Sequence, residues 1–231
     1  MATRVAHIQQ RIAAACARAG RAPDSVMLLP VSKTFDADSV RAAVSLGLHR
    51  FGENKTQEIR QKAPLLADCD IQWVMIGHLQ TNKAKDAARD VAEVQALDRL
   101  ELALALERRL QQAGRSIDVL VQVKTSNEPS KYGLAPPELE GFLRTLADQC
   151  PSLRVQGLMT LAVNSADSAA VRACFRMLRE LRDNMQALAI PGIRLERLSM
   201  GMSADFEIAI EEGSTEVRIG SAIFGSRSYP A

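Results

Sequence analysis

The chain has 231 residues, and 29 Lys and Arg against 27 Asp and Glu give it a formal net charge of +2. Nucleic-acid binders and binders of anionic membranes carry a concentrated basic excess, so this balance disfavours both classes. Hydrophobic residues make up 47% of the chain and charged residues 24%, which is typical of a globular protein. No apolar stretch approaches the roughly 20 residues that cross a bilayer.

The first predicted element is a helix over residues 3–19. Val5, Ile8, Ile12 and Cys16 recur at the spacing that places side chains on one face of a helix. The same segment is rich in arginine and alanine and lacks acidic residues, as transit peptides do. Because this helix has a place in the architecture described next, we expect it to belong to the mature protein.

Short apolar runs with the composition of β-strands then alternate with longer patterns of helical period. The predicted strands are 26–32, 48–52, 71–76, 91–96, 117–123, 153–159, 195–200 and 216–220, and the predicted helices are 36–47, 53–62, 81–89, 98–113, 136–148, 167–188 and 203–212. This alternation predicts a parallel sheet, because each parallel connection needs a crossover that returns the chain to the same edge.

Eight such units fit a closed (β/α)8 barrel of the TIM type. One helix is missing after the last strand, and the helix at 3–19 can fill that place in the outer ring. The Pro- and Gly-bearing stretches 127–137 and 190–193 are short enough to be loops. We therefore expect residues 1–231 to form a single α/β domain.

The cysteines and histidines carry no disulfide or metal signature. Cys16, Cys69, Cys150 and Cys174 lie far apart, without the CxxC spacing of a zinc site or the density of a disulfide scaffold. The three histidines are equally scattered and form no HxxxH or HExxH motif. We expect reduced thiols, a cytoplasmic protein and no bound metal.

Polar side chains at the carboxyl ends of barrel strands face the active site, while the interior layers stay apolar. Lys33 follows the nearly continuous apolar run from Val26 to Val31, so we expect it to leave the sheet at the mouth of the barrel. A desolvated lysine has a lowered pKa and can form a Schiff base with a carbonyl group. Taken alone, the feature fits more often a lysine that extends to solvent at a strand end.

The ends of the last two strands indicate a phosphate site. The segment 199–203 (SMGMS) follows the seventh strand, and Gly220-Ser221 follows the eighth. Barrels frequently bind phosphate in these two loops, although each segment alone could be a helix cap or a strand end. Together with Lys33 they indicate a phosphorylated aldehyde, for which pyridoxal 5′-phosphate (PLP) is the obvious candidate. Arg218 could then donate to the pyridine nitrogen, with a salt bridge as an equal alternative.

Five motifs make the chain resemble a known family. They are PVSKT at 30–34, FGENKTQE at 51–58, WVMIGHLQTNK at 73–83, GLMTLA at 157–162 and LSMGMSADFEIAIEEGSTEVRIGSAIFG at 198–225. Together they resemble, nearly end to end, the pyridoxal-phosphate homeostasis protein family (the YggS/PROSC type). More broadly, the fold resembles the N-terminal barrel of alanine racemase, and VRIGSAIFG is similar to the last barrel strand of that enzyme.

The resemblance implies roles for the residues that match its motifs. Lys33 would carry PLP as a Schiff base, Asn54 would lie beside the cofactor ring and Arg218 would face the pyridine nitrogen. The phosphate cradle would comprise Ser199, Ser203, Gly220 and Ser221, and which of the two serines at 199 and 203 bonds the phosphate stays open. His78 and Met200 are further candidates for the pocket wall, with a packing role equally open.

Three functions compete. The resemblance implies a PLP homeostasis protein that holds the cofactor and releases or transfers it, with apo PLP-dependent enzymes as partners and no obligatory turnover. The second function is a PLP-dependent amino-acid racemase. The third is a Schiff-base aldolase that acts on a phosphorylated sugar, because a lysine and a phosphate site would also suffice for that chemistry.

The missing parts of a racemase favour the carrier. Two-base racemisation needs an acid or base on each face of the substrate Cα, and in alanine racemase one of them is a tyrosine on a separate β domain. This sequence ends a few residues after its last strand, and neither Tyr132 nor Tyr229 lies in a context that matches that tyrosine. An arginine-paired pyridine nitrogen also makes PLP a poorer electron sink. We therefore expect no catalytic residue and, since racemases pair through the added domain, a monomer.

Overall fold

Eight parallel strands form one sheet in the computed structural model, which describes residues 1–126, 128 and 131–225. They are β1 (Met27–Pro30), β2 (Arg50–Glu53), β3 (Gln72–Met75), β4 (Glu93–Leu97), β5 (Ile117–Gln122), β6 (Leu153–Met159), β7 (Arg197–Ser199) and β8 (Glu216–Ile219), in the spatial order β1-β8-β7-β6-β5-β4-β3-β2. A parallel bridge between Val31 and Gly52 joins the two ends of that order, and the Ser32 N–H donates to the Gly52 carbonyl oxygen at 3.1 Å. The (β/α)8 barrel is confirmed.

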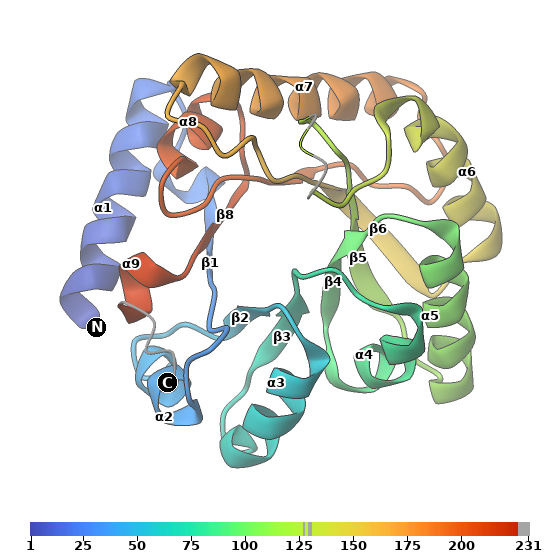
Figure 1. Cartoon of the computed structure of the whole chain (residues 1–231), viewed down its shortest axis with the longest axis horizontal. Coiled ribbons are helices and arrows are strands. Elements are labelled where there is room, and N and C mark those ends of the chain that lie inside the picture. The colour runs from blue at the N-terminus through green and yellow to red at the C-terminus, as the bar shows by residue number, and fades with distance from the viewer. Residues whose placement is uncertain (127, 129–130, 226–231) are drawn as a thin grey trace.

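A helix follows each strand, and these helices surround the sheet (Figure 1). They are α2 (Ala37–Val44), α3 (Thr56–Lys62), α4 (Ala84–Asp90), α5 (Leu100–Ala113), α6 (Leu139–Gln149), α7 (Ser168–Ala187), α8 (Phe206–Glu211) and α9 (Ser221–Phe224). Short 3-10 turns are η1 (Pro23–Ser25), η2 (Ala63–Leu66), η3 (Thr81–Lys83) and η4 (Pro136–Glu138). The apolar faces of the helices and the outer faces of the strands form the main core.

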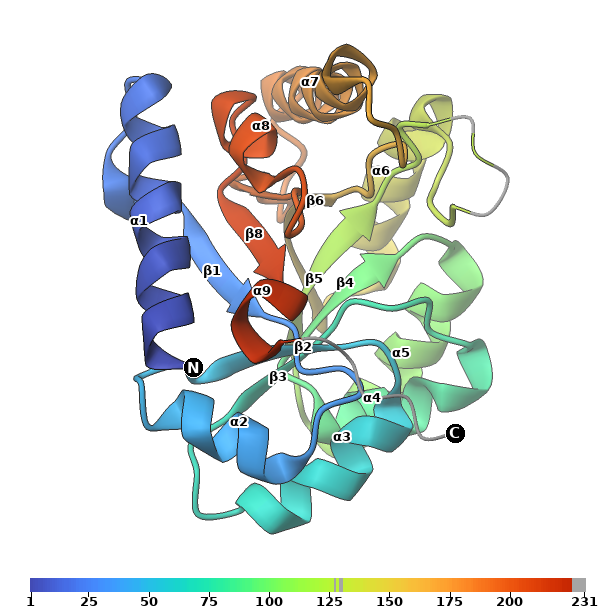
Figure 2. The ribbon, with the colours of Figure 1, turned by 60° about the vertical axis from the view of Figure 1, so that its left-hand side comes forward.

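The N-terminal helix α1 (Ala2–Arg18) takes the predicted place in the outer ring. It buries Val5, Ile8, Ile12 and Cys16 and lies beside α8 and α9, on the side of β1 and β8 (Figures 1 and 2). The Arg4 Nε donates to the carbonyl oxygen of residue 223 in α9 at 2.7 Å. Because α9 has only four residues, α1 completes the cover of the barrel after the last strand.

The predicted helix at 203–212 begins three residues later than expected, at Phe206. Gly201 has φ +97°, and a Cβ there would lie 2.9 Å from the Cα of Phe206. The carboxylate of Asp205 accepts the Met202 N–H at 2.6 Å. These two features hold residues 200–205 in a loop, so the chain reaches the mouth of the barrel as a loop and not as a helix start.

No helix in the described part of the chain is long and apolar enough to cross a membrane. The described residues also contain no group of three His, Cys, Asp or Glu side chains that could hold a metal ion. All four cysteines lie within them and are free thiols.

Candidate functional site

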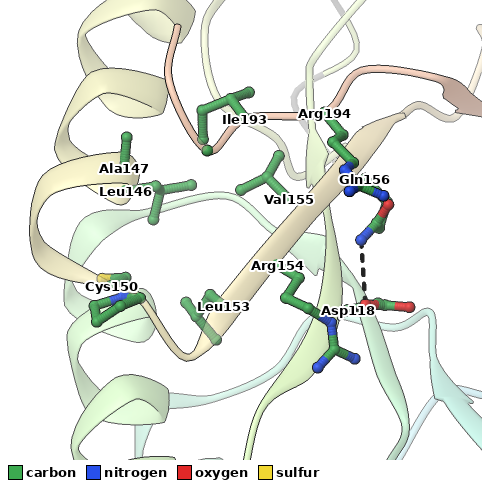
Figure 3. A pocket seen from close by; sticks show the side chains of 12 residues that line it. Asp118, Leu146, Ala147, Cys150, Leu153, Arg154, Val155, Gln156, Ile193 and Arg194 are labelled. Carbon is green, nitrogen blue, oxygen red and sulfur yellow. Dashed lines mark hydrogen bonds and ion pairs between the residues drawn. The ribbon is translucent and has the colours of Figure 1, made fainter.

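A cavity of about 800 Å³ opens at the amino-terminal end of β6, between α6 and the segment around residue 193 (Figure 3). Its charged wall residues are partly neutralised, because Arg154 pairs with Asp118 at 2.7 Å and Gln156 donates to the same carboxylate at 3.3 Å. Burial raises the pKa of the Cys150 thiol to about 11, so this cysteine is not a reactive thiolate. Barrel enzymes place their chemistry at the opposite end of the strands, and none of the predicted site residues lies here.

A second cavity, of about 490 Å³, lies at the carboxyl ends of the strands and gathers most of the predicted site. Its walls comprise Val31, Lys33, Asn54, Ile76, Gly77, His78, Gln122, Tyr132, Leu161, Met202, Ser203, Ala204, Arg218, Gly220 and Ser221. Six of the eight predicted cofactor residues are among them, together with the candidate His78. Arg218 lies on β8, and the others come from the segments that follow β1, β2, β3, β7 and β8, which are far apart in sequence and adjacent in the barrel.

Lys33 and Asn54 enter this wall from the ends of the neighbouring strands β1 and β2. Asn54 is pressed against the end of β3 at Gly77, where a Cβ would lie 2.4 Å from the Asn54 carbonyl oxygen. Only glycine allows so close an approach of the two chain segments. The three strand ends therefore form one continuous wall of the cavity.

Arg218, on β8, is buried with only 3% of its surface exposed and lines the same cavity. It donates to the carbonyl oxygens of Ser199 at 2.7 Å and Thr160 at 2.8 Å. Burial lowers its pKa to about 10, so the guanidinium remains charged at neutral pH. The carboxylates of Glu216 and Asp205 act on its charge, and its direct contacts among the described residues are hydrogen bonds to Ser199 and Thr160. The result is a fixed positive charge that can donate to a ligand.

Ser199 and Met200 do not line the cavity, contrary to the prediction. The Ser199 hydroxyl is fully buried, donates to Gln95 Oε1 at 2.7 Å and accepts from Arg218 at 2.8 Å. Met200 is fully buried in the main core. Ser199 is the last residue of β7 and still points into the barrel, and the next side chain alternates to the outer face. Ser199 therefore binds the Arg218 guanidinium from the barrel interior and does not reach the cavity.

The loops after β7 and β8 bring polar donors to the cavity. Ser203 comes from the first loop, and Gly220 and Ser221 come from the second. The first backbone bonds of α9 run from the N–H groups of Ile223 and Phe224 to the Gly220 carbonyl oxygen. The N–H groups before them belong to the orphan donors of a helix start, which suit an anion. Serine hydroxyls and backbone N–H groups are the donor set of a phosphate cradle.

His78 and Tyr132 form a stacked pair at the rim, with ring centroids 3.9 Å apart and an interplanar angle of 18°. The His78 Nδ1 lies 3.5 Å from the carboxylate of Asp98, and Gln122 donates to the Tyr132 carbonyl oxygen at 2.9 Å. Tyr132 is 57% exposed. Tyr132 was not predicted as a site residue, because its sequence context does not match that of the catalytic tyrosine of alanine racemase; Tyr229 lies outside the described residues.

The barrel interior below Arg218 is polar, whereas apolar layers were expected. Glu93 and Glu216 are buried there, and Arg197 pairs with Glu93 at 2.9 Å and with Glu216 at 2.7 Å. Arg50 pairs with the same two carboxylates at 2.8 and 3.0 Å. Burial alone would raise the pKa of Glu216, but Arg197 and Arg50 outweigh it and hold the pKa below its ordinary value. This network links the support of Arg218 to the amino-terminal end of the barrel.

Comparisons with known proteins agree with this architecture. The family model described as "Alanine racemase, N-terminal domain" matches residues 4–228. The pyridoxal phosphate homeostasis protein of Aquifex aeolicus is 42% identical, over 98% of this chain and 98% of that protein. The chain belongs to the pyridoxal phosphate homeostasis protein family. The resemblance noted in the sequence is therefore confirmed.

Solved structures of the family and of its wider fold are also similar. PipY of Synechococcus elongatus, solved with PLP bound, superposes with a TM-score of 0.83 at 35% identity, over 94% of this chain and all of that one. An alanine racemase of Clostridium difficile superposes with a TM-score of 0.72 at 15% identity, over 90% of this chain and 53% of that one. The second likeness shows the barrel fold alone. The family's barrel is thus the racemase type of (β/α)8 barrel.

Proposed function

We propose that this protein binds pyridoxal 5′-phosphate through a covalent bond to Lys33, and that it maintains PLP homeostasis by holding, releasing or transferring the cofactor. The observation that carries the proposal is the content of one cavity. Lys33, the buried cation Arg218 and the donors Ser203 and Ser221 all line it. An amine, a fixed positive charge and a set of anion donors fit a phosphorylated aromatic aldehyde. The PLP-bound PipY structure and the naming of the relatives support this assignment.

Each residue of the cavity has a different part of the cofactor to bind in this proposal. Lys33 would hold the cofactor by adding its amine to the aldehyde carbon, with one water released as the C=N bond forms. Arg218 would donate to the pyridine nitrogen, and Asn54 would lie beside the ring. Ser203, Ser221 and the backbone at Gly220 hold the phosphate. When bound, the cofactor supplies an electrophilic carbon, and a pyridine nitrogen that accepts from arginine stays unprotonated and withdraws fewer electrons.

The mouth of the cavity favours exchange over turnover. Tyr132 and Met202 line it and are 57% and 39% exposed. A site open to water hinders carbanion chemistry and allows the C=N bond to hydrolyse, which suits release of the cofactor. Racemase-like activity is the second candidate, and one observation favours it: Lys33 and Tyr132 line the same cavity, as an acid–base pair would.

We further infer that residues 1–231 form one domain, that the protein is a monomer, that it is cytoplasmic, and that apo PLP-dependent enzymes receive the cofactor. The single eight-stranded sheet supports the assignment of one domain, and the four free thiols support the cytoplasmic location. The open mouth supports the last, because a recipient can reach the cofactor there.

One sample tests the proposal. The purified protein is incubated with PLP, reduced with borohydride and mapped by peptide mass, beside Lys33→Ala. We expect a visible absorption band and a reduced adduct at Lys33, both lost in the variant. The loaded protein is then given L- and D-alanine, and afterwards an apo PLP enzyme. Turnover at ordinary enzymatic rates, or failure to yield any PLP to the acceptor, would reject the carrier in favour of a racemase or of a tightly held structural cofactor.

A further inference from the structure

Lys33 lies in a tight turn whose backbone is strained. The Phe35 N–H donates to the Ser32 carbonyl oxygen at 3.1 Å, so Lys33 and Thr34 are the two central residues of the turn. Thr34 has φ +69°, a left-handed conformation that a β-branched residue rarely adopts. Its side chain is exposed, so packing does not hold it there. Other contacts must hold the turn, because a strained backbone conformation persists only where the surrounding interactions fix it.

Three side chains hold the residues on both sides of Lys33, two of them through the main chain and one through the Ser32 hydroxyl. On one side, the Glu58 carboxylate accepts the Thr34 N–H at 2.6 Å. On the other, the Lys62 Nζ donates to the Ser32 carbonyl oxygen at 2.8 Å, and the Ser32 hydroxyl donates to Glu53 Oε1 at 2.7 Å. We call Glu53, Glu58 and Lys62 the clamp.

The clamp is a connected, largely buried unit. The Lys62 side chain is 8% exposed, and its Nζ lies 2.6 Å from Glu53 Oε1 and 3.3 Å from Glu58 Oε2. Lys62 therefore joins the two carboxylates to each other and to the backbone. Burying charged groups is costly, and apolar side chains would dock α3 against the sheet more cheaply. Their convergence on the two residues that flank Lys33 points to control of Lys33.

We propose that Glu58 and Lys62, supported by Glu53, are positioning residues that hold the turn around Lys33 so that its amine approaches the cofactor aldehyde from one direction. This inference rests on the proposed function of Lys33. The clamp does not touch the cavity, since none of its members is part of the wall. It acts only through the Lys33 backbone, and therefore on the formation of the C=N bond and not on the docking of the phosphate or the ring.

The test separates these two steps with two ligands. PLP reports both steps, whereas pyridoxine 5′-phosphate has the ring and the phosphate but no aldehyde and reports docking alone. The variants are Glu58→Ala and the double variant E53Q/K62M, which removes the buried pair without leaving a lone charge. Glu101→Ala is the matched control, because Glu101 is also an acidic residue in the first turn of a helix that follows a strand, and it is exposed.

We expect both clamp variants to form the C=N bond about tenfold more slowly than the wild type, as a displaced reacting group does. Their affinity for pyridoxine 5′-phosphate should stay within about twofold, because docking interactions are untouched. Glu58→Gln, which retains an acceptor for the Thr34 N–H, should restore part of the rate. The control should match the wild type in both measurements.

Two results would overturn the inference. If Glu58→Ala binds PLP as fast as the wild type, the clamp does not position Lys33. If the rate and the affinity for pyridoxine 5′-phosphate fall together, its role is structural support of the whole cavity. Should the double variant fail to fold, the comparison of Glu58→Ala with Glu58→Gln decides. A wild-type protein without an adduct at Lys33 would instead refute the proposed function, and this is a distinguishable outcome.

Discussion

Arg218 donates two hydrogen bonds to Ser199, one to the carbonyl oxygen at 2.7 Å and one to the hydroxyl at 2.8 Å. The same hydroxyl donates to Gln95 Oε1 at 2.7 Å and lies 3.0 Å from Glu216 Oε1. Ser199 thus connects the cationic end of the cavity to the polar interior of the barrel. Its contacts are those of a residue that orients Arg218, and they leave the phosphate to other serines.

Replacing Ser199 with Ala should weaken PLP and pyridoxal binding by similar factors. The change removes an acceptor from Arg218 and a donor from Gln95, which leaves buried polar groups unpaired at a cost of about 1–3 kcal/mol. A less firmly held Arg218 guanidinium weakens the contact with the pyridine ring, and both ligands contain that ring. Urea unfolding and parallel titrations with the two ligands measure these effects. A loss confined to PLP would show that Ser199 holds the phosphate after all.

Replacing Ser203 or Ser221 with Ala should give the opposite pattern. Both residues line the cavity, and a hydrogen bond to a charged group contributes about 1.5–3 kcal/mol. We expect PLP affinity to fall by about tenfold or more for each variant, while pyridoxal, which lacks the phosphate, loses little. Unfolding should be unchanged within about 0.5 kcal/mol, as for other surface substitutions. Equal losses for both ligands would contradict the assignment.

The sequence predicted the barrel and most of the cavity because both depend on local patterns. Strand and helix periods alternate along the chain, and a residue just after a barrel strand lies at the mouth whatever its neighbours are. Ser199 failed because it is still part of the strand and its side chain points into the barrel interior, and Met200 failed because the next side chain turns to the outer face. The end of β7 was predicted at 200 and lies at 199. Strand ends of that accuracy do not follow from periodicity.

The interior network was not predictable in the same way. Four charged residues lie at the beginnings of four strands, where local sequence does not show which of them pair: Arg50, Glu93, Arg197 and Glu216. Only closure of the barrel brings each of the two arginines within 3.0 Å of both carboxylates. Pairing across a closed sheet is a property of the tertiary fold.

Replacing Glu216 with Gln tests that network. The variant keeps the shape of the side chain but leaves Arg197 and Arg50 with one carboxylate in place of two. Removing one partner of a buried ion pair costs about 3–5 kcal/mol, so a large drop in the free energy of unfolding is expected. The double variant E216Q/R197M should recover part of that loss, as measured by denaturant titration. A single variant as stable as the wild type would mean that the network contributes no net stability.

The strain at Thr34 predicts a gain in stability that costs function. Glycine adopts a positive φ freely, so Thr34→Gly should relieve about 1–3 kcal/mol of strain and lose up to about 1 kcal/mol to the greater freedom of the unfolded chain. Ala189, with φ +46°, offers a matched control outside the cavity. Both Gly variants should unfold at the same or a higher temperature than the wild type. Only Thr34→Gly should slow covalent binding of PLP, and equal slowing in both variants would argue against a link between strain and site.

The final prediction concerns pH and Glu53. Burial raises the pKa of this carboxyl from 4.5 to about 7, against the opposing influence of Lys62 and Ser32, and its Oε2 has no hydrogen-bond partner. Between those two pH values the folded protein retains a proton that the unfolded chain has lost. The contribution of Glu53 to the free energy of unfolding is therefore fully present below about pH 4.5. It is lost as the pH rises through about 7, and the loss is on the order of 3 kcal/mol.

Glu53→Gln isolates that contribution, because glutamine resembles the protonated carboxyl and does not titrate. Urea unfolding of the wild type and the variant at pH 5, 6, 7 and 8 gives the difference in unfolding free energy at each value. The variant should gain on the wild type from pH 5 to 7, and the difference should level off above about pH 7.5. A difference that stays constant from pH 5 to 8 would mean that Glu53 is already ionised at pH 5. Its pairing with Lys62 would then outweigh the cost of burial, and the clamp around Lys33 would be equally charged over that whole range.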